Sequence, residues 1–250
     1  MLTPEEIKAK KALGEKISMV TSYDFAFAKM AEAAGVDQIL VGDSLANTML
    51  GYKSTREVGM TEMLIFAAAV CRGAPNTHVI GDMPFGSDAN PELAYDNARR
   101  FLDVGCASIK LEGTPEGVIE FLRSKDIPVC AHHGLLPQTA ENFKQKGKTE
   151  EEAAAIEAAA KYTDSLGCFE MVLEHIPEDL GSRITKGVKA ATIGIGGGKF
   201  TDGQVLVMHD ALGMHPGKIP PFATKFVDMY ALGVEGFKKY VESVNSTKQV

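Results

Sequence analysis

The chain has 250 residues, of which 45% are hydrophobic and 24% are charged, as in ordinary soluble globular proteins. Its 26 basic and 33 acidic residues give a net charge of -7, which disfavours nucleic acid or an anionic membrane surface as the main partner. No apolar run is long enough to cross a bilayer, and the N-terminal stretch MLTPEEIKAKK lacks the apolar core of a signal peptide. We therefore expect a cytoplasmic protein, and the composition leaves small metabolites open as partners.

Helical segments recur along the chain. The first begins at Thr3-Pro4, where Thr3 can cap the helix and Glu6 can complete a capping box. Thr149 and Glu152 predict a second capping box, which opens an Ala-rich helix that ends at Gly167. The other predicted helices are a segment that ends at Gly35, residues 60–72, a segment from Asn90 to Gly105, and helices opened by Thr114-Pro115-Glu116 and by Pro177.

Eight apolar runs between these helices are strand candidates: residues 16–23, 38–42, 78–82, 107–111, 127–132, 168–174, 189–197 and 204–210. Strands that alternate with helices pair in parallel through right-handed crossovers, and eight such units favour a closed (β/α)8 barrel over an open doubly wound sheet. A short N-terminal helix precedes the barrel and a helical tail follows it. Because no low-complexity linker interrupts the chain, residues 1–250 are predicted to form a single domain.

Five of the predicted strands stop at an ionisable residue, which is Asp43, Asp82, Glu112, His132 or Glu174. In a (β/α)8 barrel the C-terminal ends of all strands lie on one rim, where catalytic residues are found. A single Asp after a strand is more often a turn or cap residue. Five such ends together favour a functional site at the mouth of the barrel.

The alternation of side chains along a strand decides which residues face that mouth. Lys110 and Glu112 share a face, and so do Cys130 and His132, whereas His133 points the other way. Only one of the two adjacent histidines is therefore expected in the site.

The carboxylates of this set favour a Mg²⁺ site, with Asp43 and Asp82 as ligands. Crowded carboxylates repel one another, and a divalent cation is the simplest way to keep them ionised. The remaining histidines have no metal-ligand spacing, so we expect surface or supporting roles for His78, His175, His209 and His215. The widely spaced cysteines are expected to be buried reduced thiols: Cys71, Cys106, Cys130 and Cys168.

Two motif-like strings do not carry the function that they suggest. The stretch GIGGGK (194–199) lacks the spacing and the Ser or Thr of a Walker A loop, because Phe200 follows the lysine. We interpret it as a tight turn that lines the rim. The string GDSL (42–45) is also found in a family of serine hydrolases, but no accompanying base supports Ser44 as a nucleophile.

Further motifs resemble the ketopantoate hydroxymethyltransferase family over nearly the whole chain. In the order of that family they are TSYDFAFAKMAEAAGVDQILVGDSL, LGYKST, DMPFGS, IKLEG, the HxGLxPQ segment that starts at His132, VLEHIP and GIGGGKFTDGQVLVMHDALG. The resemblance implies a (β/α)8 barrel of the phosphoenolpyruvate/pyruvate type, a Mg²⁺ ion, 5,10-methylenetetrahydrofolate as one-carbon donor and 3-methyl-2-oxobutanoate as acceptor. It also implies a cyclic homo-oligomer, typically a decamer.

The same resemblance assigns roles to residues of this chain. It makes Asp43 and Asp82 the metal ligands, with Glu112 close to the metal, and Glu174 the catalytic base. Ser44 and Lys110 then hold the keto acid, and His132 contacts the hydroxyl side of the substrate. Departures from the family pattern lie beside the site and affect acceptor identity and pocket shape: Ala46, Asn47, Thr48, Ala131, His133, Leu136 and His175.

Two other functions compete with this one. A related barrel lyase or aldolase would act on another 2-oxo acid, but that family has a reactive cysteine on a mobile loop, and the four cysteines here fall elsewhere. A barrel that only binds a metabolite would not need so complete a set of ionisable residues.

Overall fold

The computed structural model describes residues 1–247, which form two compact units, Met1–Val205 and a second that begins at Leu206. The first unit holds a closed barrel in which eight parallel strands are paired in chain order. The strands are β1 (Ile17–Thr21), β2 (Gln38–Val41), β3 (His78–Asp82), β4 (Ser108–Lys110), β5 (Val129–Gly134), β6 (Glu170–Glu174), β7 (Ala191–Ile195) and β8 (Gly203–Leu206). The predicted fold class is confirmed.

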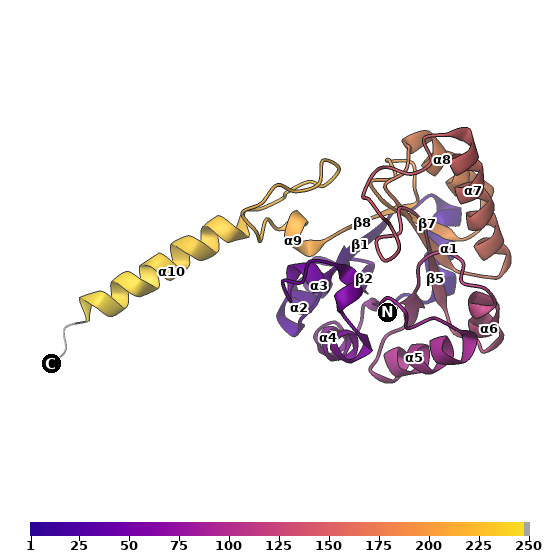
Figure 1. The fold of residues 1–250 in the computed structure, drawn as a ribbon. Helices are drawn as coiled ribbons and strands as arrows, with labels where there is room; N and C mark the ends of the chain where they lie inside the picture. Colours follow the sequence, from indigo (N-terminus) through magenta and orange to yellow (C-terminus); the bar gives the residue numbers. More distant parts are fainter. Residues whose placement is uncertain (248–250) are drawn as a thin grey trace. The chain divides into compact units, whose positions relative to one another are not determined.

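Helices connect the successive strands from β1 to β7 and lie outside the ring that the strands form, whereas a loop connects β7 to β8 (Figure 1). They are α2 (Phe25–Ala34), α3 (Leu45–Thr48), the 3-10 turn η1 (Thr55–Glu57), α4 (Met60–Gly73), α5 (Pro91–Asp103), α6 (Val118–Ser124), α7 (Glu150–Ser165) and α8 (Glu178–Gly187). Close contact with the sheet depends on small residues. Gly81 of β3 is one of these, because a Cβ there would overlap the ring of Phe101 on α5.

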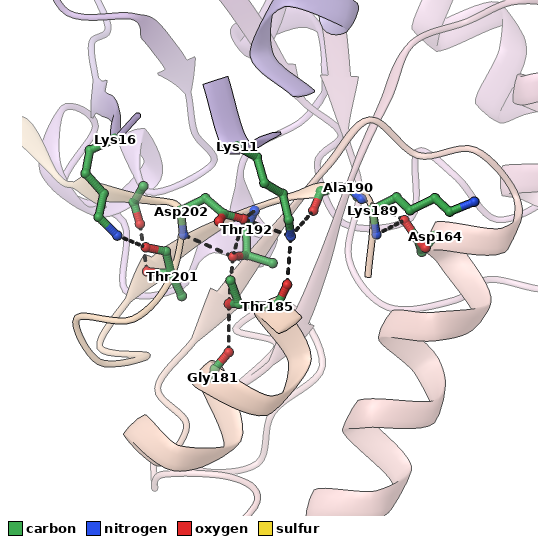
Figure 2. Close-up of polar contacts among 11 residues, drawn as sticks. Lys11, Lys16, Asp164, Gly181, Thr185, Lys189, Ala190, Thr192, Thr201 and Asp202 are labelled. Atoms are coloured by element: carbon green, nitrogen blue, oxygen red, sulfur yellow. Dashed lines mark hydrogen bonds and ion pairs between the residues drawn. The ribbon is translucent and has the colours of Figure 1, made fainter. Parts of the chain in front are cut away.

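Helix α1 (Pro4–Leu13) precedes the barrel and begins with the predicted capping box between Thr3 and Glu6. Its Lys11 donates hydrogen bonds to the carbonyl oxygens of Thr185 (2.8 Å) and Ala190 (2.9 Å), and forms an ion pair with Asp202 (3.0 Å). Figure 2 shows how this one ammonium group lies between the end of α8 and the segments before β7 and β8. The N-terminal helix is therefore fastened to the last part of the barrel.

Two predicted boundaries and one predicted capping box were wrong. Helix α6 begins at Val118 rather than at Thr114, because Gly117 adopts a left-handed conformation (φ 70°) that a helix cannot include. The run 204–210 is extended only as far as Leu206, and α9 (Met208–Ala211) follows. At α7 the side chain of Thr149 caps as predicted, but the carboxylate of Glu152 accepts from Gly147 and Lys148 instead of completing the box.

The second unit contains α9 and α10 (Met229–Ser246), the predicted helical tail. The backbone N–H groups of Phe226, Met229 and Tyr230 donate to carbonyl oxygens of residues 211–213, which joins the start of α10 to the end of α9. No residue of α10 is buried. Among the described residues no helix combines the length and apolarity needed to cross a membrane.

Candidate active site

The carboxylates that end β2 and β3 lie together at the C-terminal rim of the barrel. Asp43 follows β2, and its backbone N–H donates to Oδ2 of Asp82 at 3.2 Å. Asp43 is 7% exposed and Asp82 is 1% exposed. Burying two acids side by side is costly unless they are compensated, which is typical of a functional site.

Lys110 supplies one positive charge to this pair. It is paired in register with Asp82 across β3 and β4, and its Nζ lies 2.7 Å from Asp82 Oδ1. Burial opposes the charge on the ammonium group, but the neighbouring carboxylates of Asp82, Asp43 and Glu112 outweigh it and raise the pKa of Lys110. The lysine therefore stays protonated at neutral pH.

Negative charge nevertheless remains in excess over this lysine. Burial, reinforced by Asp82, raises the pKa of Asp43 to about 7. Burial also raises the pKa of Glu112 to about 9, where Asp43 and Asp82 add repulsion and Lys110 partly offsets it. A further cation at this position would let these acids ionise.

The donors at this rim are carboxylate oxygens, which Mg²⁺ prefers as ligands. In the arrangement that residues 1–247 adopt, no three His, Cys, Asp or Glu side chains are placed to enclose an ion. Mg²⁺ retains several waters and is usually held by only one or two carboxylates together with its ligand. Asp43 and Asp82 fit that role, and Glu112 lies near them because Gln138 bonds to both Glu112 and Asp43.

Gln138 organises these acids, and sequence reasoning gave it no role. Its side-chain Nε2 donates to Asp43 Oδ2 and to the carbonyl oxygen of Met83, both at 2.9 Å. Its backbone N–H donates to Glu112 Oε2 at 3.1 Å. The only signal was its place at the end of the HxGLxPQ segment, because a buried amide in a loop has no distinguishing pattern.

Arg56 connects Gln138 to two other loops of the rim. Its Nε donates to the carbonyl oxygen of Gln138, and its guanidinium lies over the ring of Phe85, 5.4 Å from the centroid. Arg56 belongs to η1, Phe85 follows β3 and Gln138 follows β5. One cationic side chain therefore joins three loops at the mouth.

His132 faces the interior of the mouth with both ring nitrogens unpartnered among the described residues. Nε2 lies 3.2 Å from Glu174 Oε2 and Nδ1 lies 3.6 Å from Glu112 Oε1, but neither contact has hydrogen-bond geometry. Burial, together with the charge of Lys110, lowers the pKa of His132 well below its usual range. A neutral, buried imidazole of this kind can bind a polar group of a substrate.

His133 points away from the mouth, as the alternation predicted. Its Nε2 lies 2.9 Å from Oγ1 of Thr163 on α7, and burial lowers its pKa to about 3. Of the two roles expected for His78, the structure shows a supporting one, because His78 is fully buried and bonds the Leu2 carbonyl and Ser108.

Glu174 is the most accessible acid of the site, with 21% of its side chain exposed. Burial raises its pKa to about 7, while Lys110 and His175 act in the opposite direction. A carboxylate that titrates near neutral pH can both accept and return a proton.

Ser44 is paired with a phenol rather than with a base. Its Oγ lies 2.8 Å from the hydroxyl of Tyr23, and burial raises the pKa of Tyr23 to about 12. A protonated phenol cannot activate a serine nucleophile. The hydroxyl pair offers hydrogen bonds at the rim instead.

Two of the residues that depart from the family pattern form hydrogen bonds within their own loop. The Asn47 amide donates to the carbonyl oxygen of Tyr52 (2.9 Å), and the Thr48 hydroxyl donates to that of Ser44 (3.0 Å). Ala46 is fully buried, and His175 has a positive φ of 47°. These residues shape the loops that carry Ser44 and Glu174.

Comparison with known proteins adds to this geometry. A family model described as ketopantoate hydroxymethyltransferase matches residues 1–249. The chain is 44% identical over 244 residues to a 3-methyl-2-oxobutanoate hydroxymethyltransferase of Thermotoga neapolitana, covering 95% of this chain and 90% of the relative. It is also 44% identical over 251 residues to the enzyme of that name from Ignicoccus hospitalis, covering 98% and 95%.

Solved structures show the same fold at low sequence identity. Phosphonopyruvate hydrolase in complex with oxalate and Mg²⁺ superposes with a TM-score of 0.65 at 13% identity, covering 97% of this chain and 99% of that one. A 2,3-dimethylmalate lyase, described as a member of the PEP mutase/isocitrate lyase superfamily, gives 0.58 at 14% identity, covering 98% and 89%. The chain therefore shares the barrel fold of these enzymes.

Proposed function

The chain belongs to the ketopantoate hydroxymethyltransferase family, and we propose that it transfers a hydroxymethyl group to 3-methyl-2-oxobutanoate, giving 2-dehydropantoate. The donor is 5,10-methylenetetrahydrofolate, and the product is a precursor of pantothenate and coenzyme A. The proposal rests on the rim that contains Asp43, Asp82, Lys110 and Glu174. There the partly exposed Glu174, with a pKa near 7, belongs to the same site as the buried ion pair of Lys110 and Asp82.

Asp43 and Asp82 would hold Mg²⁺, with Glu112 close to it. When bound, the ion supplies Lewis-acid polarisation of the keto and carboxylate oxygens of a 2-oxo acid. Phosphonopyruvate hydrolase, which has the same fold, has been solved in complex with oxalate and Mg²⁺, and this is consistent with such a site.

The chain's own residues would bind the acid and move its proton. Lys110 and the Ser44 hydroxyl orient the 2-oxo acid, and the charge of Lys110 stabilises negative charge as it develops on the keto oxygen. Glu174 accepts the C3 proton, and the resulting carbanionic C3 forms a bond to the methylene carbon of the folate. Both carbon–nitrogen bonds of this methylene carbon break, the first as the new carbon–carbon bond forms and the second as water displaces the remaining nitrogen. Tetrahydrofolate leaves, and water provides the oxygen of the new hydroxyl. His132 contacts that side of the substrate.

Solvent exchange isolates the proton-transfer step. In D2O with Mg²⁺ and without folate, the protein should exchange the C3 proton of 3-methyl-2-oxobutanoate for deuterium, which NMR detects. Glu174→Gln should abolish exchange, whereas Glu151→Gln, at an exposed position on α7, should leave it unchanged. Exchange that survives in Glu174→Gln would exclude Glu174 as the base.

We also propose that subunits associate with one another. Apolar side chains recur on α10 at helical spacing, and Phe237, Val241 and Val244 are exposed. Sedimentation velocity would give the number of subunits. A monomer at micromolar concentration would contradict the proposal.

A further inference from the structure

Two thiols face each other on the outside of the barrel, away from the proposed active site. Cys71 lies near the end of α4, and Cys106 lies in the turn between α5 and β4. Their Sγ atoms are 3.9 Å apart, in a geometry that permits a thiol hydrogen bond. Both cysteines are free in the structure.

The turn that carries Cys106 packs directly on α4. Gly105 has a φ of 111°, and a Cβ at this position would lie 3.0 Å from the Cβ of Cys71. A disulfide has a sulfur–sulfur distance of about 2.0 Å, so the two sulfurs need to approach by about 1.9 Å. Adjustment of two side-chain torsions and a small movement of this turn can supply that approach.

The two thiols differ in a way that suits stepwise oxidation. Cys71 is partly exposed, and the hydrogen bond from Cys106, aided by the charge of Arg72, lowers its pKa. Cys106 is 5% exposed, and its contact with Cys71, together with burial, raises its pKa. The accessible thiol is therefore the more reactive one, and the protected thiol lies beside it.

The other cysteines lack this arrangement. Cys130 and Cys168 are buried, and burial raises the pKa of Cys168 to about 12 and that of Cys130 well above its usual range. They serve as internal controls for thiol chemistry in the same chain.

We propose that Cys71 and Cys106 form a redox-active pair that a peroxide converts into a reversible disulfide. The Cys71 thiolate attacks hydrogen peroxide, giving a sulfenic acid and hydroxide. The thiol of Cys106 then attacks the sulfenic sulfur, and a disulfide and water result. Overall, two thiols and one peroxide give one disulfide and two waters, and a dithiol reductant reverses the change.

Mass spectrometry of the folded protein tests this pair. Reduced protein treated with an equimolar amount of hydrogen peroxide should lose the mass of two hydrogen atoms and recover it with dithiothreitol. Trypsin digestion should then yield peptides 57–72 and 101–110 linked to each other, each of which contains one cysteine. Cys168→Ala should retain this link.

Single-residue variants distinguish the thiol that peroxide oxidises from the thiol that then forms the disulfide. Cys106→Ser should accumulate a sulfenic acid at Cys71 that dimedone traps, and Cys71→Ser should show neither the trapped acid nor the link. The proposal is overturned if the wild-type protein keeps both thiols after treatment, if it carries only sulfinic acid at Cys71, or if oxidation joins other cysteines. Near-wild-type circular dichroism establishes that each variant is folded.

Discussion

The side-chain amide of Gln138 donates a hydrogen bond to the carboxylate of Asp43 at 2.9 Å, across 95 positions of the chain. The same nitrogen donates to the carbonyl oxygen of Met83, so the amide links the loops after β2, β3 and β5. A hydrogen bond to an ionised carboxylate favours the charged form, which is the form that a metal ligand requires. Gln138 thus acts as a positioning residue for the predicted metal ligand.

Gln138→Leu keeps the approximate volume of the side chain and removes its donors. We expect weaker Mg²⁺ binding by calorimetry and a fall in kcat/KM of about tenfold to a hundredfold, because a hydrogen bond to a charged group contributes about 1.5–3 kcal/mol. Gln145→Leu makes the same change in the same loop and should leave both quantities unchanged. Unaltered Mg²⁺ affinity in Gln138→Leu would remove the positioning role.

Proton exchange at C3 should depend on pH through Glu174. Burial raises the pKa of this acid to about 7, and only its ionised form can accept a proton. The exchange rate should therefore fall about tenfold for each pH unit below about 7 and level off above it. A rate that stays constant from pH about 5 to about 7 would mean that a different group titrates.

Glu170 makes the folded protein sensitive to alkali. It is fully buried, and burial raises its pKa to about 8, while the hydrogen bond from Gln38 (3.0 Å) partly opposes this. Between about pH 4.5 and 8 the unfolded chain has lost this proton and the folded chain retains it. The free energy of unfolding therefore decreases as the pH rises through this window.

Glu170→Gln removes that proton equilibrium and keeps an oxygen that can accept from Gln38. The substitution should raise the urea midpoint at pH about 8 and reduce the loss of stability between pH about 5 and about 8. Glu151→Gln, at an exposed position, should leave the pH dependence as in the wild-type protein. An unchanged profile in Glu170→Gln would show that another group is responsible.

Gly134 ends β5 and lies in register with Glu174 at the end of β6. It has a φ of 98°, and a Cβ there would overlap the carbonyl oxygen of Glu174. Gly134→Ala should lower the free energy of unfolding by about 1–2 kcal/mol for the left-handed backbone and by about 1–3 kcal/mol for the overlap.

Gly14→Ala is the matched control, because Gly14 has a φ of 71° with open space around a Cβ. It should show only the backbone cost in urea unfolding, and it should retain activity. Equal destabilisation by the two substitutions would mean that the backbone near Glu174 relaxes freely.

Most of the fold could be predicted from the sequence, because strands buried on both faces appear as short apolar runs and the helices between them begin and end at capping residues. Errors arose where one residue's backbone conformation decided the outcome. Thr114-Pro115-Glu116 has the composition of a helix start, yet the left-handed Gly117 delays α6 to Val118. The sequence contains no direct sign that this glycine adopts that conformation.

The rim could be predicted from strand ends and alternation, which placed Lys110 and His132 towards the mouth and His133 away from it. The polar contacts between residues far apart in the chain could not be predicted in this way. The bonds from Gln138 to Asp43 and from Gln38 to Glu170 join positions far apart in the chain, and they depend on the register of the closed barrel. The roles of the rim residues in the reaction remain predictions.

The attachment of Lys11 constrains the order in which the protein folds. Its carbonyl partners lie 174 and 179 positions further along the chain, so α1 cannot dock until nearly the whole barrel has been synthesised. Contacts of such high sequence separation close late and slow folding, because the entropy of a long loop is lost before the contact forms. During translation, α1 would leave the ribosome well before the segments on which it docks.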